Sequence, residues 1–188
     1  MPTRVTIKHR SMALAFSSAA AMTCLSVGLV AAPAATAQPD KNIDVRASIQ
    51  ANAATPATHQ CEKRNGVDGA PYTNPAILGT APGDTWHSVG TVTDTTCVYQ
   101  TPEGVSYTGT ESGTVTIDGC GTGFVVLEFE GSLSPDFSSE RSTARLQPGK
   151  GTGDLKGATG DVVSESTLNP DGSATGQLTG TVHCPKAG

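Results

Sequence analysis

GTVTIDGCGTGFVVLEFEGSL, residues 113–133, contains two segments rich in Val, Thr and Phe on either side of the turn DGCG. β-branched and aromatic residues favour strands, and Asp-Gly is a strong signal for a tight hairpin turn. The second segment, 123–133, alternates so that Val125, Leu127 and Phe129 share one face. This stretch predicts an antiparallel hairpin.

The same pattern continues on both sides of this hairpin. Strand-like segments precede it at 85–94, 97–101 and 105–117 and follow it at 161–168 and 173–184. Turn sequences separate them, notably PEG at 102–104 and NPDG at 169–172. No segment of this region keeps a helical period with caps. We therefore predict an all-β, antiparallel sandwich or barrel domain over residues 85–188.

The N-terminus has the pattern of a secretory signal peptide. Three basic residues lie within the first ten, an Ala-rich apolar run follows, and a small-x-small cleavage pattern ends at Ala37. A membrane anchor is the alternative, but Pro33 interrupts the apolar run and a cleavage pattern follows it. We predict a signal peptide over residues 1–37 and a secreted chain that has no stable membrane insertion after cleavage.

Two segments separate this leader from the domain. Residues 38–60 are rich in Ala, Asn, Thr and Gln and predict a flexible linker, with one short strand through Ile43, Val45 and Ile49 as the alternative. Residues 61–84 hold several Gly and Pro turn pairs and predict an irregular segment that Cys61 pins to the domain.

Four cysteines follow the leader: Cys61, Cys97, Cys120 and Cys184. An even number of cysteines in an exported chain predicts two disulfides, although spacing does not choose among the three pairings. A zinc site is disfavoured because no two of these cysteines are close in sequence.

The acidic charge of the chain disfavours nucleic acid as a partner. The net charge of the whole chain is −5, and the predicted leader holds three of the twelve basic residues and none of the seventeen acids. The rest of the chain is therefore more acidic, which disfavours binding to nucleic acid. We expect no cofactor and no metal, and the oligomeric state stays open.

A glycine run, PGKGTGDLKGATG at 148–160, is similar to a phosphate-binding loop. Such a loop requires a helix directly after it, whereas the next segment here is strand-like. Glycine also permits close backbone approach. We expect Leu155 to turn inward and plug one end of a barrel, with Thr152 and Asp154 bonded to turn backbone.

The segments GKGTGDLKGATG and GTVTIDGCGTGFVVLEFEG together resemble bacterial domains of the allene oxide cyclase-like and dirigent-like barrel group. The likeness covers about residues 85–184. It implies a closed, antiparallel, eight-stranded β-barrel with a central cavity. The catalytic residues of the group's cyclases have no position-by-position match in this chain, so the resemblance implies the fold and not the activity.

Three residues are weak candidates for a ligand site. Glu128 and Glu130 share one strand face, and we favour the interpretation that both meet water while Val125, Leu127 and Phe129 point inward. Trp86, the only tryptophan, either lines a barrel mouth or fills the core, and core is favoured. No hydrolase motif is present, so no catalytic residue is assigned.

Two functions remain open. The favoured one is a non-catalytic barrel that binds a small apolar ligand or serves as a surface interaction module. The alternative is a cyclase or isomerase of the barrel group, which rests on resemblance alone. The geometry of the barrel interior decides between them: an enclosed pocket lined by Glu128, Glu130 or a tyrosine favours catalysis, and a filled barrel favours a structural role.

Overall fold

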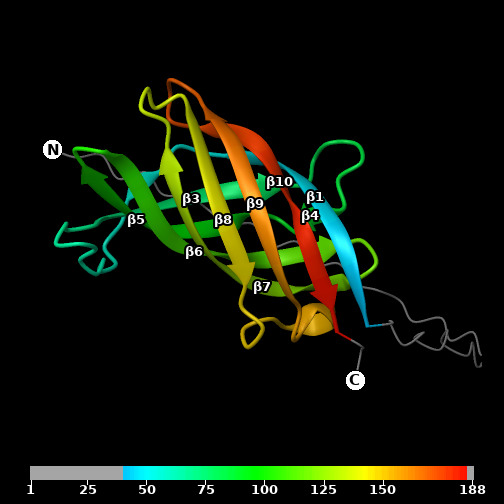
Figure 1. The fold of residues 1–188 in the computed structure, drawn as a ribbon. Coiled ribbons are helices and arrows are strands. Elements are labelled where there is room, and N and C mark those ends of the chain that lie inside the picture. Colours follow the sequence, from blue (N-terminus) through cyan, green and yellow to red (C-terminus); the bar gives the residue numbers. More distant parts are fainter. Residues whose placement is uncertain (1–39, 186–188) are drawn as a thin grey trace, which may run out of the picture. The chain divides into compact units, whose positions relative to one another are not determined.

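The computed structural model describes residues 40–185 as one antiparallel sheet with ten strands (Figure 1). The elements are β1 (Lys41–Ala51), β2 (Thr55–Pro56), β3 (Ala70–Leu78), β4 (Trp86–Ser88), β5 (Val92–Thr101), β6 (Gly104–Ile117), β7 (Gly121–Leu133), β8 (Ser139–Leu146), the 3₁₀ turn η1 (Gly153–Leu155), β9 (Thr159–Leu168) and β10 (Ala174–Cys184). The predicted all-β class is confirmed. The predicted signal peptide lies outside the described residues, within which no helix could span a bilayer.

Eight of the strands form a closed ring. The order of pairing is β1-β10-β9-β8-β7-β6-β5-β3, and the end of β3 pairs with the end of β1. The short strands β2 and β4 pair with β3 and β6. The predicted hairpin over 113–133 is present as β6 and β7, paired from Ile117↔Gly121 outward. Closure is short, because β3 pairs only with residues 49–51 of β1, and the rest of that edge of β1 has no partner strand in the described part of the chain.

The flexible linker expected over residues 38–60 is wrong for most of that range. Lys41–Ala51 form β1, which pairs with β10 along its whole length. Val45 and Ala47 are buried, and Ile43, Ile49 and Ala51 pack against the core, so every second residue faces inward. Small and medium apolar residues suffice here because β10 pairs with the whole strand and β3 pairs with its last three residues.

The irregular segment expected over 61–84 also contains a strand, β3. Pro71 and Pro75 made this range read as turns, because proline cannot donate to a sheet ladder. Both prolines precede Ala76, where the pairing of β3 with β1 begins. In this part of β3 the strand β5 pairs along one side, and only the two-residue strand β2 lies on the other. The sheet can therefore accept two residues that have no N–H group to donate.

Two further elements differ from expectation. The strand predicted over 85–94 is divided into β4 and the start of β5, with Gly90 between them at φ +83°. Strand β8 was not predicted because its sequence, SERSTARL, has almost no large apolar residues. Its inward positions carry Ser142 and Ala144, and these small side chains leave room inside the ring.

One end of the ring is filled with side chains. Trp86, Val115, Ile117, Leu155 and Val182 are each 1% exposed or less and belong to one hydrophobic cluster. The glycine run folds over this end through η1, the single coiled turn in Figure 1. Leu155 is buried there as predicted.

Hydrogen bonds hold the glycine run in place. The backbone N–H of Thr122 donates to Asp154 Oδ2 at 3.1 Å, and the N–H of Phe124 donates to Thr152 Oγ1 at 3.3 Å. A Cβ on Gly123 would overlap the carbonyl oxygen of Thr152. The glycines therefore serve close backbone approach, as expected, but Thr152 and Asp154 bond the backbone of β7 and not that of a turn.

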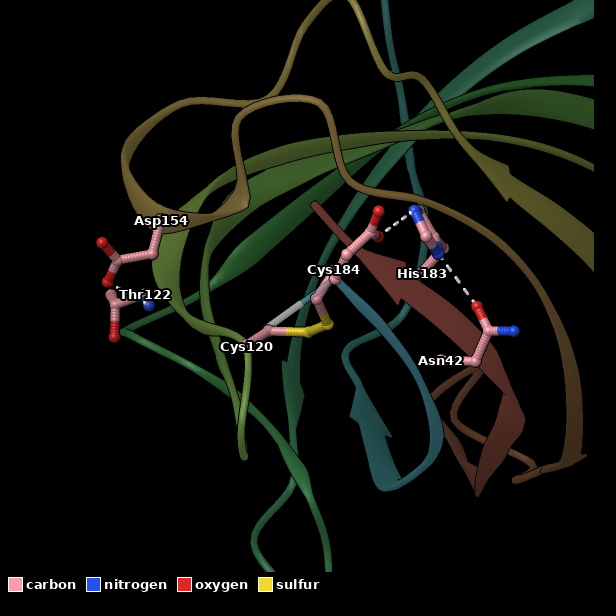
Figure 2. Close-up of a disulfide and its surroundings, with 7 residues drawn as sticks. Asn42, Cys120, Thr122, Asp154, His183 and Cys184 are labelled. Carbon is pink, nitrogen blue, oxygen red and sulfur yellow. Dashed lines mark hydrogen bonds and ion pairs between the residues drawn. A yellow bond between two sulfur atoms is a disulfide. The ribbon is translucent and has the colours of Figure 1, made fainter. Parts of the chain in front are cut away.

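Two disulfides resolve the open pairing. Cys61 bonds Cys97, with their Cα atoms 5.7 Å apart, and Cys120 bonds Cys184, with their Cα atoms 5.5 Å apart. The second bridge joins the β6–β7 turn to the end of β10 beside His183, whose Nδ1 lies 3.0 Å from Asn42 Oδ1 (Figure 2). Two disulfides indicate that the chain matures in an oxidising environment.

Candidate ligand-binding cavity

The end of the ring opposite Trp86 holds a cavity of about 250 Å³. Its wall is mainly apolar and includes Ile49, Leu78, Val98, Leu127, Phe129, Leu133, Leu168 and Leu178. The space exists because several inward positions carry small residues: Ala51, Ala76, Ser142, Ala144, Ser164 and Ala174. A ring of eight strands is just wide enough for its side chains to fill it, so small residues at one end leave room for a ligand.

Three acids line this cavity. Asp94 lies on β5 and Glu111 directly opposite it on β6, and Glu140 comes from β8. The lining residues within the described chain include no Lys, Arg or His. The three carboxyl groups therefore share a largely apolar interior that provides no cationic side chain.

The Asp94–Glu111 pair holds protons unusually tightly. Removal from bulk water raises the pKa of Glu111 to about 7, and a hydrogen bond with Asp94 opposes that rise in part. Burial also raises the pKa of Asp94 well above its ordinary value, and repulsion from Glu111 and Glu140 adds to the rise. Two carboxyl groups so close in a site of low polarity cannot both ionise readily, so the pair retains a proton near neutral pH.

Glu140 and Tyr107 form a second polar group at the same wall. Burial raises the pKa of Glu140, and interactions with the hydroxyls of Ser166 and Tyr107 oppose this rise. Burial and the nearby carboxyl groups raise the pKa of Tyr107 as well, which keeps its phenol protonated. The Tyr107 ring also packs edge-on against Phe129, with centroids 6.0 Å apart.

Two polar atoms of these lining residues have no hydrogen-bond partner among the described residues. They are Oδ1 of Asp94 and Oγ of Ser166, both inaccessible to solvent. Ser166 is only 5% exposed, and its buried hydroxyl lies beside the cavity. No donor or acceptor among the described residues meets hydrogen-bond geometry with it. Buried polar atoms are normally satisfied, so these two atoms mark this wall as incompletely hydrogen-bonded.

The residues that sequence singled out do not line this cavity. Trp86 is fully buried at the filled end, which confirms the core interpretation. Glu128 and Glu130 are exposed on the outside of β7, as favoured, and Glu130 forms an ion pair with Arg64 at 3.1 Å. Sequence reasoning missed Asp94, Glu111 and Glu140.

One cluster within residues 40–185 has metal-like spacing, and it is not in the cavity. Side-chain atoms of His59, Cys61 and Cys97 lie within 4.8 Å of one another. Both sulfurs belong to a disulfide and offer no thiolate, so the cluster does not form a metal site. The three cavity acids do not meet the same distance condition together.

Comparison with known proteins gives little. No family model matches the chain, and no curated protein matches it. Among solved structures, a protein of unknown function from the DUF3224 family of Shewanella oneidensis MR-1 is similar, with a TM-score of 0.47 and 15% identity, over 78% of this chain and 100% of that one. The allene oxide cyclase-like assignment is not confirmed, and no residue role is transferred.

The raised pKa of Glu111 predicts how stability depends on pH. The folded chain keeps a proton on Glu111 between its ordinary pKa of 4.5 and about 7, where the unfolded chain has lost it. Stability from this group is therefore highest at low pH and falls as pH rises toward 7. Replacing Glu111 with Gln is expected to stabilise the protein by about 2 kcal/mol near pH 8 and by little near pH 4.

Urea unfolding across this pH range measures the effect. Glu128→Gln is the matched control, because Glu128 is exposed on the neighbouring strand and should change stability by less than about 0.5 kcal/mol. An unaltered pH dependence in Glu111→Gln would contradict the burial assigned to this carboxyl group.

Proposed function

We propose that this chain is a secreted, closed eight-stranded β-barrel that binds one small, mostly apolar molecule in its interior. The observation that carries the proposal is the cavity of about 250 Å³ at one end of a ring whose other end is filled with buried side chains. Clefts that bind small molecules are typically apolar with a few convergent polar groups, and this wall has that composition.

The energetics of the cavity support a role in binding. An empty apolar cavity lowers stability in proportion to its volume, and larger side chains on β8 would remove it. Strand β8 instead carries Ser142 and Ala144 at its inward positions. The two disulfides add the stability that a scaffold with an unfilled interior lacks.

Export is part of the same proposal. The predicted leader and the two disulfides agree on an oxidising destination outside the cytoplasm. A secreted barrel with one open end suits the carriage or capture of a molecule that is poorly soluble in water.

Filling the cavity tests the binding role. Ala144→Phe is expected to abolish binding of 2-phenylethanol, a small neutral probe, as measured by calorimetry and ligand-observed NMR. Thr143→Phe is the matched control: it adds the same side chain at the next residue, which is exposed on the outside of β8. Equal binding by both variants, with wild-type circular dichroism, would place the probe outside the cavity and overturn the proposal.

Acid–base catalysis is a second candidate function, because a proton-sharing pair and Tyr107 line a largely apolar cavity. Mass spectrometry of molecules extracted from wild-type and Glu111→Gln protein, both produced in the natural host, separates the two. A binder yields the same molecule from each form that retains one, whereas an enzyme retains unconverted substrate only in the variant.

A further inference from the structure

We propose that the molecule bound in this cavity carries a protonated amine on an apolar body, and that Asp94 and Glu111, with Glu140, bind its ammonium group. This inference rests on the proposed binding function and names the chemical class of the ligand. Three features of the cavity carry it. Acids lie on its wall, its described lining residues include no Lys, Arg or His, and two polar atoms of the wall lack hydrogen-bond partners.

The charge balance of the cavity favours a cationic ligand. A buried carboxylate is stable only when it is paired or hydrogen-bonded, and otherwise it takes up a proton. Salt bridges occupy the described carboxylates of Asp161 and Glu165 on the outside of the ring, where Arg145 and Arg141 pair with them. No such partner lines the inside, so the missing cation is expected to arrive with the ligand.

The unpartnered atoms show that this wall lacks hydrogen-bond donors for them among the described residues. Asp94 Oδ1 is a pure acceptor when the carboxyl group is ionised, and an ammonium offers donors and no acceptor. The hydroxyl of Ser166 accepts equally well. The Tyr107 and Phe129 rings line the same wall, and aromatic faces also attract cations.

A metal ion fits this site less well than an organic cation. Calcium requires six or more oxygen ligands at short distance, and the three carboxyl groups are not gathered that closely. The rest of the wall is aliphatic and aromatic, which suits the apolar body of an amine.

Binding of an ammonium should release a proton. Below about pH 7 the acidic pair is protonated, so the incoming cation displaces a proton from a carboxyl group to solvent, and no covalent bond changes. The titratable groups that line the cavity are Tyr72, Asp94, Tyr107, Glu111 and Glu140. The raised pKa of Tyr107 keeps its phenol neutral, so we assign the pH dependence to the carboxyl groups, and amine affinity rises from pH 5 to about pH 7.

The test compares two probes of equal size, phenethylamine and 2-phenylethanol, by calorimetry in buffers of different ionisation enthalpy. We expect wild-type protein to bind the amine at least roughly tenfold more tightly near pH 7.5 and to release a proton near pH 6. Glu111→Gln and Asp94→Asn should reduce the preference to less than about threefold and suppress the release. Glu128→Gln, on the outside of β7, should leave both unchanged.

The outcomes separate the two proposals. Equal binding of both probes overturns the amine inference and leaves the binding function standing. Calcium binding that Glu111→Gln abolishes, with no preference for the amine, assigns the acids to a metal and also overturns it. Failure of wild-type protein to bind either probe counts against the binding function itself. Amine preference that survives in both cavity variants places the ammonium elsewhere and overturns the assignment to these acids.

Discussion

Removing the Cys120–Cys184 bridge by the double substitution Cys120→Ala and Cys184→Ala is expected to reduce the free energy of unfolding by about 4 kcal/mol. The bridge closes a separation of 64 residues and both cysteines are buried in the core cluster. Its loss increases the conformational entropy of the unfolded chain and weakens packing at the filled end of the ring. Urea unfolding of the oxidised protein measures the difference.

A pair of nearby substitutions provides the control for the disulfide variant. Thr116 and Thr122 lie across the same β6–β7 hairpin, with their hydroxyl oxygens 2.8 Å apart and exposed. Replacing both with Ala should reduce stability by no more than about 1 kcal/mol, as for an exposed hydrogen bond. A disulfide variant that loses no more than this control would show that the bridge does not constrain the fold.

Truncating the only tryptophan is the second large effect. Trp86 is fully buried at the filled end, so Trp86→Ala should destabilise the protein by about 3–5 kcal/mol through the cavity it leaves. Trp86→Phe is the informative companion. The indole N–H of Trp86 has no hydrogen-bond partner among the described residues, so its removal forfeits no bond.

The phenylalanine variant should therefore lose much less, on the order of 1–2 kcal/mol for the smaller ring. Circular dichroism in urea follows both variants, since neither retains tryptophan fluorescence. Similar losses for Ala and Phe would mean that the indole N–H is bonded after all or that the end of the ring repacks.

The hairpins were predictable because their signals are local. Turn residues and alternating apolar side chains fixed β6 and β7 directly. Strand β1 was harder, because its modest apolar residues become a strand only when β10 and β3 pair with it. The burial of Leu155 followed from its being the only large apolar residue in a glycine run.

The acidic pair was within reach of the sequence. The two-residue turn between Thr101 and Gly104 fixes the register of β5 against β6. Counting seven residues back from Thr101 and seven forward from Gly104 places Asp94 opposite Glu111. Sequence could therefore pair these acids, but which face of the pair lies inward depends on how the ring closes, and that is not a local property.

Ring closure by β1 has a consequence for how the chain is made. Lys41 pairs with Cys184, so the first and last strands of the fold are neighbours although nearly the whole domain separates them in sequence. During synthesis residues 174–184 must leave the ribosome before β1 can pair with β10, its main partner, and before the interior is complete. Such distant contacts slow folding, so a nascent chain that lacks its last strand is a long-lived target for proteases and chaperones.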